Sequence, residues 1–128
     1  MDAQQELFIR LKLNIEAEGY KVFDGALPPE NTPYPFVYLG DFEQNDRETK
    51  SHPYGNVYPT IHVWHNKETE RGTVSDMLYR IKQICRKITH TTTYAWSVRN
   101  VKSRIITDTT TKAPLLHGII EAEWFFFS

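Results

Sequence analysis

Cysteine is almost absent from this sequence, and long apolar runs are absent altogether. Its single cysteine, Cys85, can form no internal disulfide and no cysteine-based zinc site within one chain. No apolar run approaches the roughly 18 residues that a membrane-spanning helix needs, and the chain starts with the polar residues MDAQQE. A signal peptide would place a charged and then an apolar stretch there. We therefore expect a reducing compartment, with neither membrane insertion nor export.

An excess of either charge is also missing. The chain contains 15 Lys and Arg against 16 Asp and Glu, with a pI of about 6.5, whereas a dedicated DNA-binding domain is expected above about 9. The charge is unevenly spread, because residues 1–66 hold 5 basic and 10 acidic residues and residues 67–128 hold 10 and 6. If the halves form separate surfaces, this asymmetry suits head-to-tail contact between copies better than nucleic-acid binding.

Motifs that carry chemistry are missing as well. The six glycines are scattered, and there is no G-x-S-x-G, H-E-x-x-H, Walker or G-x-G-x-x-G motif. His62 and His65 are three positions apart in an expected strand, so they point to opposite faces and cannot share one ion. Glu121 and Glu123 share a strand face, a spacing that acid–base chemistry can use, but no pocket motif accompanies them. We expect no enzyme, no cofactor and no metal site.

What is present is enough apolar material for one core. The chain weighs 15.0 kDa, with 40% hydrophobic and 13% aromatic residues, which fits a single domain over residues 1–128. Apolar residues at helical spacing predict a helix over residues 2–18, ended by Gly19, and a second helix over residues 73–88. Cys85 falls on the apolar face of the second helix, where a buried hydrophobe is more common than a nucleophile.

Strand-like patterns fill much of the rest. Pro59 has no N–H, which favours an edge strand or the start of a strand, and a phase shift near Asn100 predicts a β-bulge. In the last strand, even-numbered residues such as Trp124 and Phe126 are expected in the core. The expected strands cover residues 20–23, 36–42, 57–65, 94–107 and 115–127.

The order of these elements predicts an α+β fold. Consecutive strands joined by hairpins favour an antiparallel or mixed sheet, and two amphipathic helices most simply cover one face of it. The result is a two-layer sandwich with a long closing hairpin. The uncovered face then meets solvent or another subunit. The candidate subunit interface comprises Ile119, Glu121, Glu123, Phe125 and Phe127.

The stretch from residue 43 to residue 55 is the most polar part of the chain. Because strand-like segments flank it, we expect the extended tip of a hairpin that projects from the body. A plain solvated loop is the simpler interpretation, and a partner-binding loop is the functional one. The candidate partner-contact residues are Asp46, Arg47, Glu48 and Lys50.

Nucleic-acid binding is an alternative that the basic residues leave open. Those of the second helix and of the strand after it could form one basic surface, although the former are also the ordinary polar side of an amphipathic helix. The residues are Arg80, Lys82, Arg86 and Lys87 on the helix, and Arg99, Lys102 and Arg104 on the strand.

The arrangement of pieces along nearly the whole chain resembles the tail completion proteins of long-tailed bacteriophages, the family of tail terminators and tail-to-head joining proteins. The pieces are the helix ending at Gly19, V-F-D at 22–24, P-Y-P-F-V-Y-L-G at 33–40, a polar excursion, I-H-V-W-H at 61–65, the helix from Thr73 and the closing hairpin.

This resemblance implies a non-enzymatic virion component, assembled in the host cytoplasm. Copies would form a homo-oligomeric ring, six-fold in symmetry, on the tail tube protein. The ring would stop tube growth or dock to the head connector protein, and DNA would pass through it without specific binding. The alternatives are a head-side connector or other phage morphogenesis protein, and a small α+β binding module, including a nucleic-acid-binding one.

Overall fold

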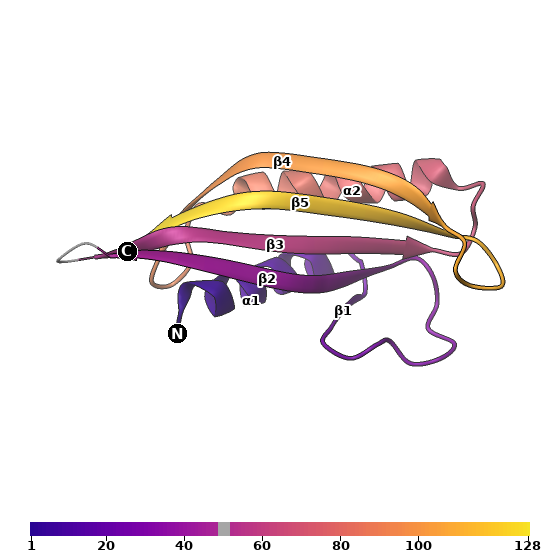
Figure 1. The fold of residues 1–128 in the computed structure, drawn as a ribbon, viewed down its shortest axis with the longest axis horizontal. Helices are drawn as coiled ribbons and strands as arrows, with labels where there is room; N and C mark the ends of the chain where they lie inside the picture. The colour runs from indigo at the N-terminus through magenta and orange to yellow at the C-terminus, as the bar shows by residue number, and fades with distance from the viewer. Residues whose placement is uncertain (49–51) are drawn as a thin grey trace.

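A five-stranded mixed sheet with two helices on one side forms the body of the protein. The computed structural model describes residues 1–48 and 52–128. The strand order is β1-β2-β3-β5-β4, in which only the β1–β2 pair is parallel. The α+β fold is therefore confirmed. The elements are α1 (Ala3–Ala17), β1 (Val22–Asp24), β2 (Phe36–Glu48), β3 (Pro53–His65), α2 (Arg71–Lys87), β4 (Ala95–Asp108) and β5 (Leu115–Phe127) (Figure 1).

The first helix forms as the apolar spacing predicts. The Asp2 side chain caps its start by accepting a hydrogen bond from the backbone N–H of Gln5 at 2.9 Å. Leu7, Leu11 and Ile15 are fully buried on its sheet-facing side. The helix ends before Gly19, whose φ of +103° lies in the left-handed region that favours glycine. Figure 1 shows the helix lying beside β2.

The second helix begins two residues earlier than the periodicity predicts, at Arg71. Next to this start, His65 Nε2 lies 2.7 Å from Glu70 Oε1, which anchors the helix to the end of β3. Cys85 is completely buried, and that burial raises the pKa of its thiol to about 12. It is thus a buried hydrophobe, as expected. Gly118 of β5 lets the helix approach closely, since an added Cβ there would lie 3.0 Å from side-chain atoms of Val74 and Leu78.

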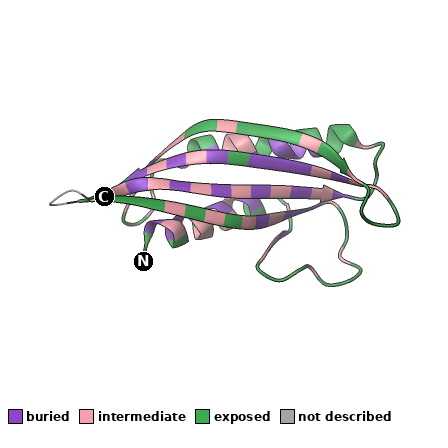
Figure 2. Cartoon of the chain, in the orientation of Figure 1, coloured by how far each residue is buried: buried purple, intermediate pink, exposed green. Residues whose placement is uncertain are grey.

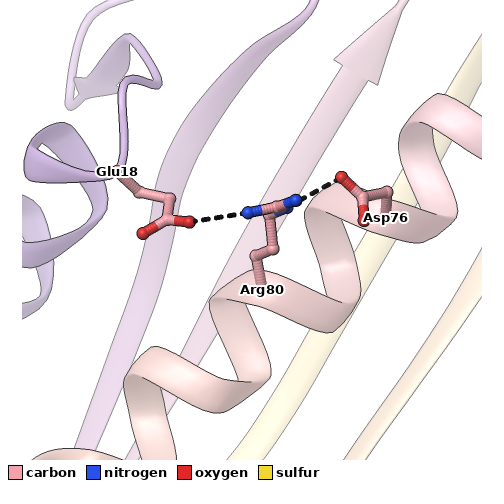
Figure 3. Close-up of polar contacts among 3 residues, drawn as sticks. All are labelled: Glu18, Asp76 and Arg80. Atoms are coloured by element: carbon pink, nitrogen blue, oxygen red, sulfur yellow. Dashed lines mark hydrogen bonds and ion pairs between the residues drawn. The ribbon is translucent and has the colours of Figure 1, made fainter.

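An arginine joins the two helices. Arg80 Nη1 lies 3.1 Å from Glu18 Oε1 at the end of α1, while Arg80 Nε donates to Asp76 Oδ2 at 2.8 Å (Figure 3). The guanidinium therefore bridges a carboxylate of each helix. Because these groups are largely solvent-exposed, their contribution to stability is modest.

The core lies between the helices and the sheet. Along β3, buried and partly exposed residues alternate without interruption from Gly55 to His65 (Figure 2). In β5 the alternation places Trp124 and Phe126 in the core, while Phe127 is 47% exposed. The predicted assignment of the two faces of β5 is therefore confirmed.

The expectation that Pro59 lies in an edge strand or at the start of a strand is wrong. Pro59 lies in the middle of β3, between β2 and β5. Two irregularities accommodate its missing N–H. The β2–β3 register shifts between Leu39 and Phe42, and the paired residues of β3 and β5 skip from Val57 to Thr60. The predicted bulge in β4 is confirmed, since its register with β5 shifts between Arg99 and Lys102.

The polar stretch at 43–55 is mostly strand rather than a projecting loop. Its cross-strand pairs continue from Glu43 with Tyr58 to Glu48 with Pro53. This corrects the expected extent of the tip. The reason is that β5 supports the same part of β3, as the pairs Tyr54–Phe127 and Val57–Trp124 show, and a strand paired on one side offers a ladder to a strand on the other.

Candidate partner-binding surface

The face of the sheet that the helices leave uncovered is the candidate functional surface, called the open face below. It consists of the residues that alternate with the core positions. From one end to the other it changes from aromatic and imidazole groups, through charged groups, to phenylalanines. Its main members are Tyr38, Asn56, Tyr58, Thr60, His62, Trp64, Arg99, Lys102, Arg104, His117, Ile119, Glu121, Glu123, Phe125 and Phe127.

An imidazole pair stacked on a tryptophan occupies one end of the open face. His62 Nδ1 lies 2.7 Å from His117 Nε2, and the two rings are stacked with centroids 5.0 Å apart. The Trp64 ring lies parallel to His117, with an interplanar angle of 9° and centroids 3.8 Å apart. Next to them, the Tyr38 hydroxyl donates to the Gly25 carbonyl at 2.7 Å. These contacts join β2, β3 and β5 to the proline-rich loop.

Both histidines of this cluster are neutral near pH 7. The pKa of His117 is lowered to about 4, mainly by burial and also by the neighbouring His62 and Arg104, while Asp108 opposes them. Burial likewise lowers the pKa of His62, against the opposing charges of Asp41 and Glu121. With both rings neutral, one ring N–H donates to the unprotonated nitrogen of the other.

A groove of about 920 Å³ runs beside this cluster. The proline-rich loop forms one wall, and residues near the β4–β5 turn form the other. His62 and Trp64 also line the groove. Leu27, which is 87% exposed, lies at its rim. The groove therefore offers apolar and aromatic surface next to a few polar groups, as binding surfaces commonly do.

The middle of the open face is charged. Arg99 pairs in register with Glu123, and Lys102 pairs with Glu121, across β4 and β5. Glu121 and Glu123 do share one face, as predicted, but each stands opposite a basic residue. That arrangement is a cross-strand charge ladder, which stabilises strand pairing. A shallow depression of about 650 Å³ lies at the same level, where the β4 bulge and Pro59 interrupt the regular pairing.

Aromatic side chains form the other end of the open face, near the C-terminus. The ring centroids of Phe125 and Phe127 lie 5.9 Å apart, and those of Tyr54 and Phe125 lie 6.2 Å apart. The Arg99 guanidinium stands 5.8 Å from the centroid of the Phe125 ring, a cation–π distance. The half-buried Phe125 and the exposed Phe127 thus form an apolar patch with a cation at its border.

The structure brings Phe125 and Phe127 of the predicted interface to the same end of the molecule as the described residues of the predicted contact loop. Arg47 pairs with Tyr54, and Tyr54 pairs with Phe127. Asp46 lies next to Arg47 and accepts from Gln44 Nε2 at 2.6 Å. Glu48 is the last residue of β2, and Lys50 lies outside the described residues. Of the predicted interface, Ile119 differs from the others, because only 7% of it is exposed.

The His62–His117–Trp64 cluster is the feature that sequence reasoning missed. His62 and His117 are 55 positions apart, and each looks like an isolated polar residue on a strand. Alternation alone places all three side chains on the outer face, but only the β3–β5 register sets them side by side. The prediction that His62 and His65 point to opposite faces is confirmed, since His65 is buried under α2.

The basic residues do not form the single surface that nucleic-acid binding would use. Arg99, Lys102 and Arg104 pair with open-face residues of β5, whereas those of α2 lie in the helix layer on the other side of the sheet. Arg80 is also engaged by two carboxylates. Among the described residues, no three His, Cys, Asp or Glu side chains gather to hold a metal ion, and none of the helices described is long and apolar enough to cross a membrane.

Solved structures provide the comparison, because the sequence matches no protein-family model and no curated protein. A chain of the virion of the native gene transfer agent particle superposes with a TM-score of 0.62 over 96% of this chain and 94% of that chain, at 15% identity. The gp17 protein of bacteriophage SPP1 superposes with a TM-score of 0.56 over 95% and 89%, at 26% identity. These neighbours confirm the resemblance to the tail completion family and the fold of a bacteriophage virion protein.

Proposed function

We propose that this protein completes the phage tail. In this proposal it is a non-enzymatic structural component at the head–tail interface of the virion, and it stops growth of the tail tube, joins the tail to the head connector, or does both. The observation that carries the proposal is the match of nearly the whole chain to two proteins of phage or virion origin, one of them at 26% identity.

The proposal includes a ring of six identical copies. A ring needs a heterologous interface, in which one surface of each copy binds a different surface of the next. The patch of the half-buried Phe125 and the exposed Phe127 supports such a role, because large apolar side chains left on a surface commonly mark contact sites. Partners in this arrangement are further copies of the chain, the tail tube protein and the head connector protein, with DNA in the lumen.

The hairpin of β2 and β3 is the proposed contact to a neighbouring ring. Its distal half is polar and extends to Glu48 on one strand and Pro53 on the other. Asp46, Arg47, Glu48 and Lys50 are its candidate contact residues. The exposed side chains of this distal half lie away from the core, and among the described residues only β5 pairs with it from outside. Substitutions of these side chains should therefore leave the fold intact.

Electron microscopy of particles that lack this protein tests the role. Loss of a tail terminator gives overlong tails, whereas loss of a joining protein gives normal tails beside filled heads. Labelling the protein within intact particles then places it at the neck or elsewhere. A label on the capsid shell, or particles that stay normal and infectious without the protein, would contradict the proposal.

Replacing the two open-face phenylalanines tests the contact surface. The double variant Phe125→Ser and Phe127→Ser should reduce binding to tails or to other copies more than it reduces the free energy of unfolding, since Trp124 and Phe126 hold the core side. Tail binding and urea unfolding are measured on the same samples. Equal loss of folding and binding would show that these side chains serve the fold instead.

A further inference from the structure

The sheet has two edges without a strand partner. Residues 89–91 cover the start of β4, where Trp96 N–H donates to the Thr89 carbonyl and His90 bridges Ala95. From Ser97 onward no described residue pairs with the outer side of β4. On the opposite edge, β1 pairs only with residues 37–39 of β2. The outer side of β2 from Asp41 onward has no strand partner within the described residues either.

The two edges carry opposite charge. Arg99, Lys102 and Arg104 are exposed on the free part of β4, which has no acidic residue before Asp108. On the free part of β2, exposed acidic residues outnumber the single exposed basic residue, Arg47. These acidic residues are Asp41, Glu43 and Asp46.

The directions of the two edge strands fit one another. Since β2, β3 and β5 are antiparallel in turn, β2 and β5 run the same way, and β4 runs against both. Rotation about an axis along the strands keeps these directions. The β4 edge of one copy would therefore meet the β2 edge of the next as an antiparallel pair, and antiparallel pairing is the more favourable geometry.

The charges also match in position. Glu43 pairs with Tyr58, and Arg99 pairs with Glu123. Tyr58 and Glu123 each adjoin the paired residues Val57 and Trp124 of β3 and β5, so they lie at the same level. Glu43 and Arg99 thus lie in one row across the sheet and on its open face, so neighbouring sheets placed side by side without a shift bring them together.

We propose that copies of this chain join edge to edge, with the basic β4 edge of one copy pairing antiparallel to the acidic part of β2 around Asp41 and Glu43 in the next. This deepens the ring of the proposed function and rests on it. Like charges oppose pairing of two β4 edges or two β2 edges, so the charges favour a head-to-tail edge contact, the kind of interface that can close a ring. Charges that merely protected the edges from aggregation would have no reason to differ in sign.

Charge reversal gives the first test. Variant one carries Asp41→Lys and Glu43→Lys, and variant two carries Arg99→Glu and Lys102→Glu. Each alone should self-associate about tenfold less tightly or worse in sedimentation experiments at millimolar concentration, because like charges meet at every contact. An equimolar mixture should recover association, because the two variants can alternate around the ring.

The matched control reverses two exposed acidic residues away from both edges, Glu16→Lys and Glu30→Lys. It changes the net charge as much as variant one does and should leave association unchanged. Thermal unfolding of each variant separates lost folding from lost association, which matters for variant two because its new carboxylates face Glu121 and Glu123. Failure of the mixture to recover association would overturn the edge pairing.

Cysteine cross-linking reads the contact directly. A chain with Glu43→Cys is mixed with chains carrying Arg99→Cys or Arg104→Cys, which covers pairing with and without a shift, and a short bis-maleimide is added. Cys85 is buried and unreactive. Links should form between the two kinds of chain and not within one kind. Links between two chains that both carry Glu43→Cys would overturn the edge pairing. So would the absence of links, whether the sample forms multimers or stays monomeric.

The two proposals fail separately. Ring-shaped multimers that give no links between the β2 and β4 edges would contradict the edge contact and leave tail completion standing. Linked multimers in purified protein, together with intact particles that lack the protein at the neck, would contradict tail completion and leave the edge contact standing.

Discussion

The two faces of the sheet are built from the same strands but have different roles. The helix-covered face is apolar and closed, and its side chains from β3 and β5 are almost completely buried. The open face carries histidines, a charge ladder and exposed phenylalanines. Successive residues of a strand point to opposite faces, so a chain of this size builds its core and its contact surface from neighbouring positions.

The neighbouring residues Phe126 and Phe127 illustrate the difference between the two faces. Phe126 is 2% exposed and Phe127 is 47% exposed. Both are phenylalanines in the last strand, and only the side of the sheet that each faces differs. Stability should therefore follow the face, not the residue type, and five experiments test that comparison.

The largest difference is expected between these two phenylalanines. Phe126→Ala should lower the free energy of unfolding by about 3–5 kcal/mol, because it removes a buried ring and leaves a cavity. Phe127→Ala should lower it by less than about 1 kcal/mol. Urea unfolding of both variants measures the contrast, and equal losses would mean that the open face contributes to the core.

Two glycines test how closely the helix layer approaches the sheet. Gly118→Ala should destabilise the protein by about 1–3 kcal/mol, since its methyl group would press on Val74 and Leu78. Gly72→Ala, in the first turn of α2, meets nothing within 4 Å and should stabilise by about 0.4–1 kcal/mol. Thermal unfolding of both variants shows whether the signs differ.

A buried carboxylate is the polar exception in the helix layer. Glu6 is 7% exposed, and its Oε1 accepts from the Thr91 hydroxyl at 2.6 Å and the Thr93 N–H at 2.9 Å. Glu6→Gln should cost about 1–2 kcal/mol at pH 7, because a charge-assisted bond becomes a neutral one. Urea unfolding measures the cost.

The same carboxylate predicts a pH effect. Burial raises the pKa of Glu6, but the bonds from Thr91 and Thr93 outweigh burial and hold it below its ordinary value of 4.5. A lowered folded-state pKa gives stability that is present above 4.5 and lost as the pH falls further. The Gln variant should lose less stability than the natural chain between pH 5 and 3. An identical loss would show that other groups cause it.

The smallest effect concerns the open face. The folded-state pKa of His117 lies at about 4, below its ordinary value of 6.5. The unfolded chain therefore binds a proton first, and stability should fall as the pH drops from 6.5 toward 4. His117→Gln should reduce that slope, apart from any loss at pH 7 of the ring contacts with Trp64 and His62. A slope that is the same in the variant would assign it to other groups.

Sequence patterns predicted most of the fold. Helical spacing located both helices within two residues of their observed starts, and alternation assigned Trp124 and Phe126 to the core. Two predictions were wrong for the same reason: that Pro59 lies at an edge or a strand start, and that the strands of the β2–β3 hairpin stop before the polar stretch at 43–55. Both depended on which strands lie on either side of β3, and local sequence does not encode that.

For the candidate site, the pattern identified which residues face outward but not which of them meet. Phe125, Phe127, Glu121 and Glu123 were placed on the open face from the alternation of β5 alone. The His62–His117 contact, the charge ladder and the two free edges depend on strand order and register. These come from contacts between distant parts of the chain.

The sequence by itself determined the elements, the faces that each one buries, and the lack of any motif for catalysis or metal binding, because helical and strand periodicity are local properties. Only the tertiary structure decided that the free parts of β4 and β2 lie on opposite sides of the sheet with opposite charge, and that two distant histidines share a hydrogen bond. Strand order is chosen by the packing of the whole core, so a residue's neighbours across the sheet follow from the fold and not from its place in the chain.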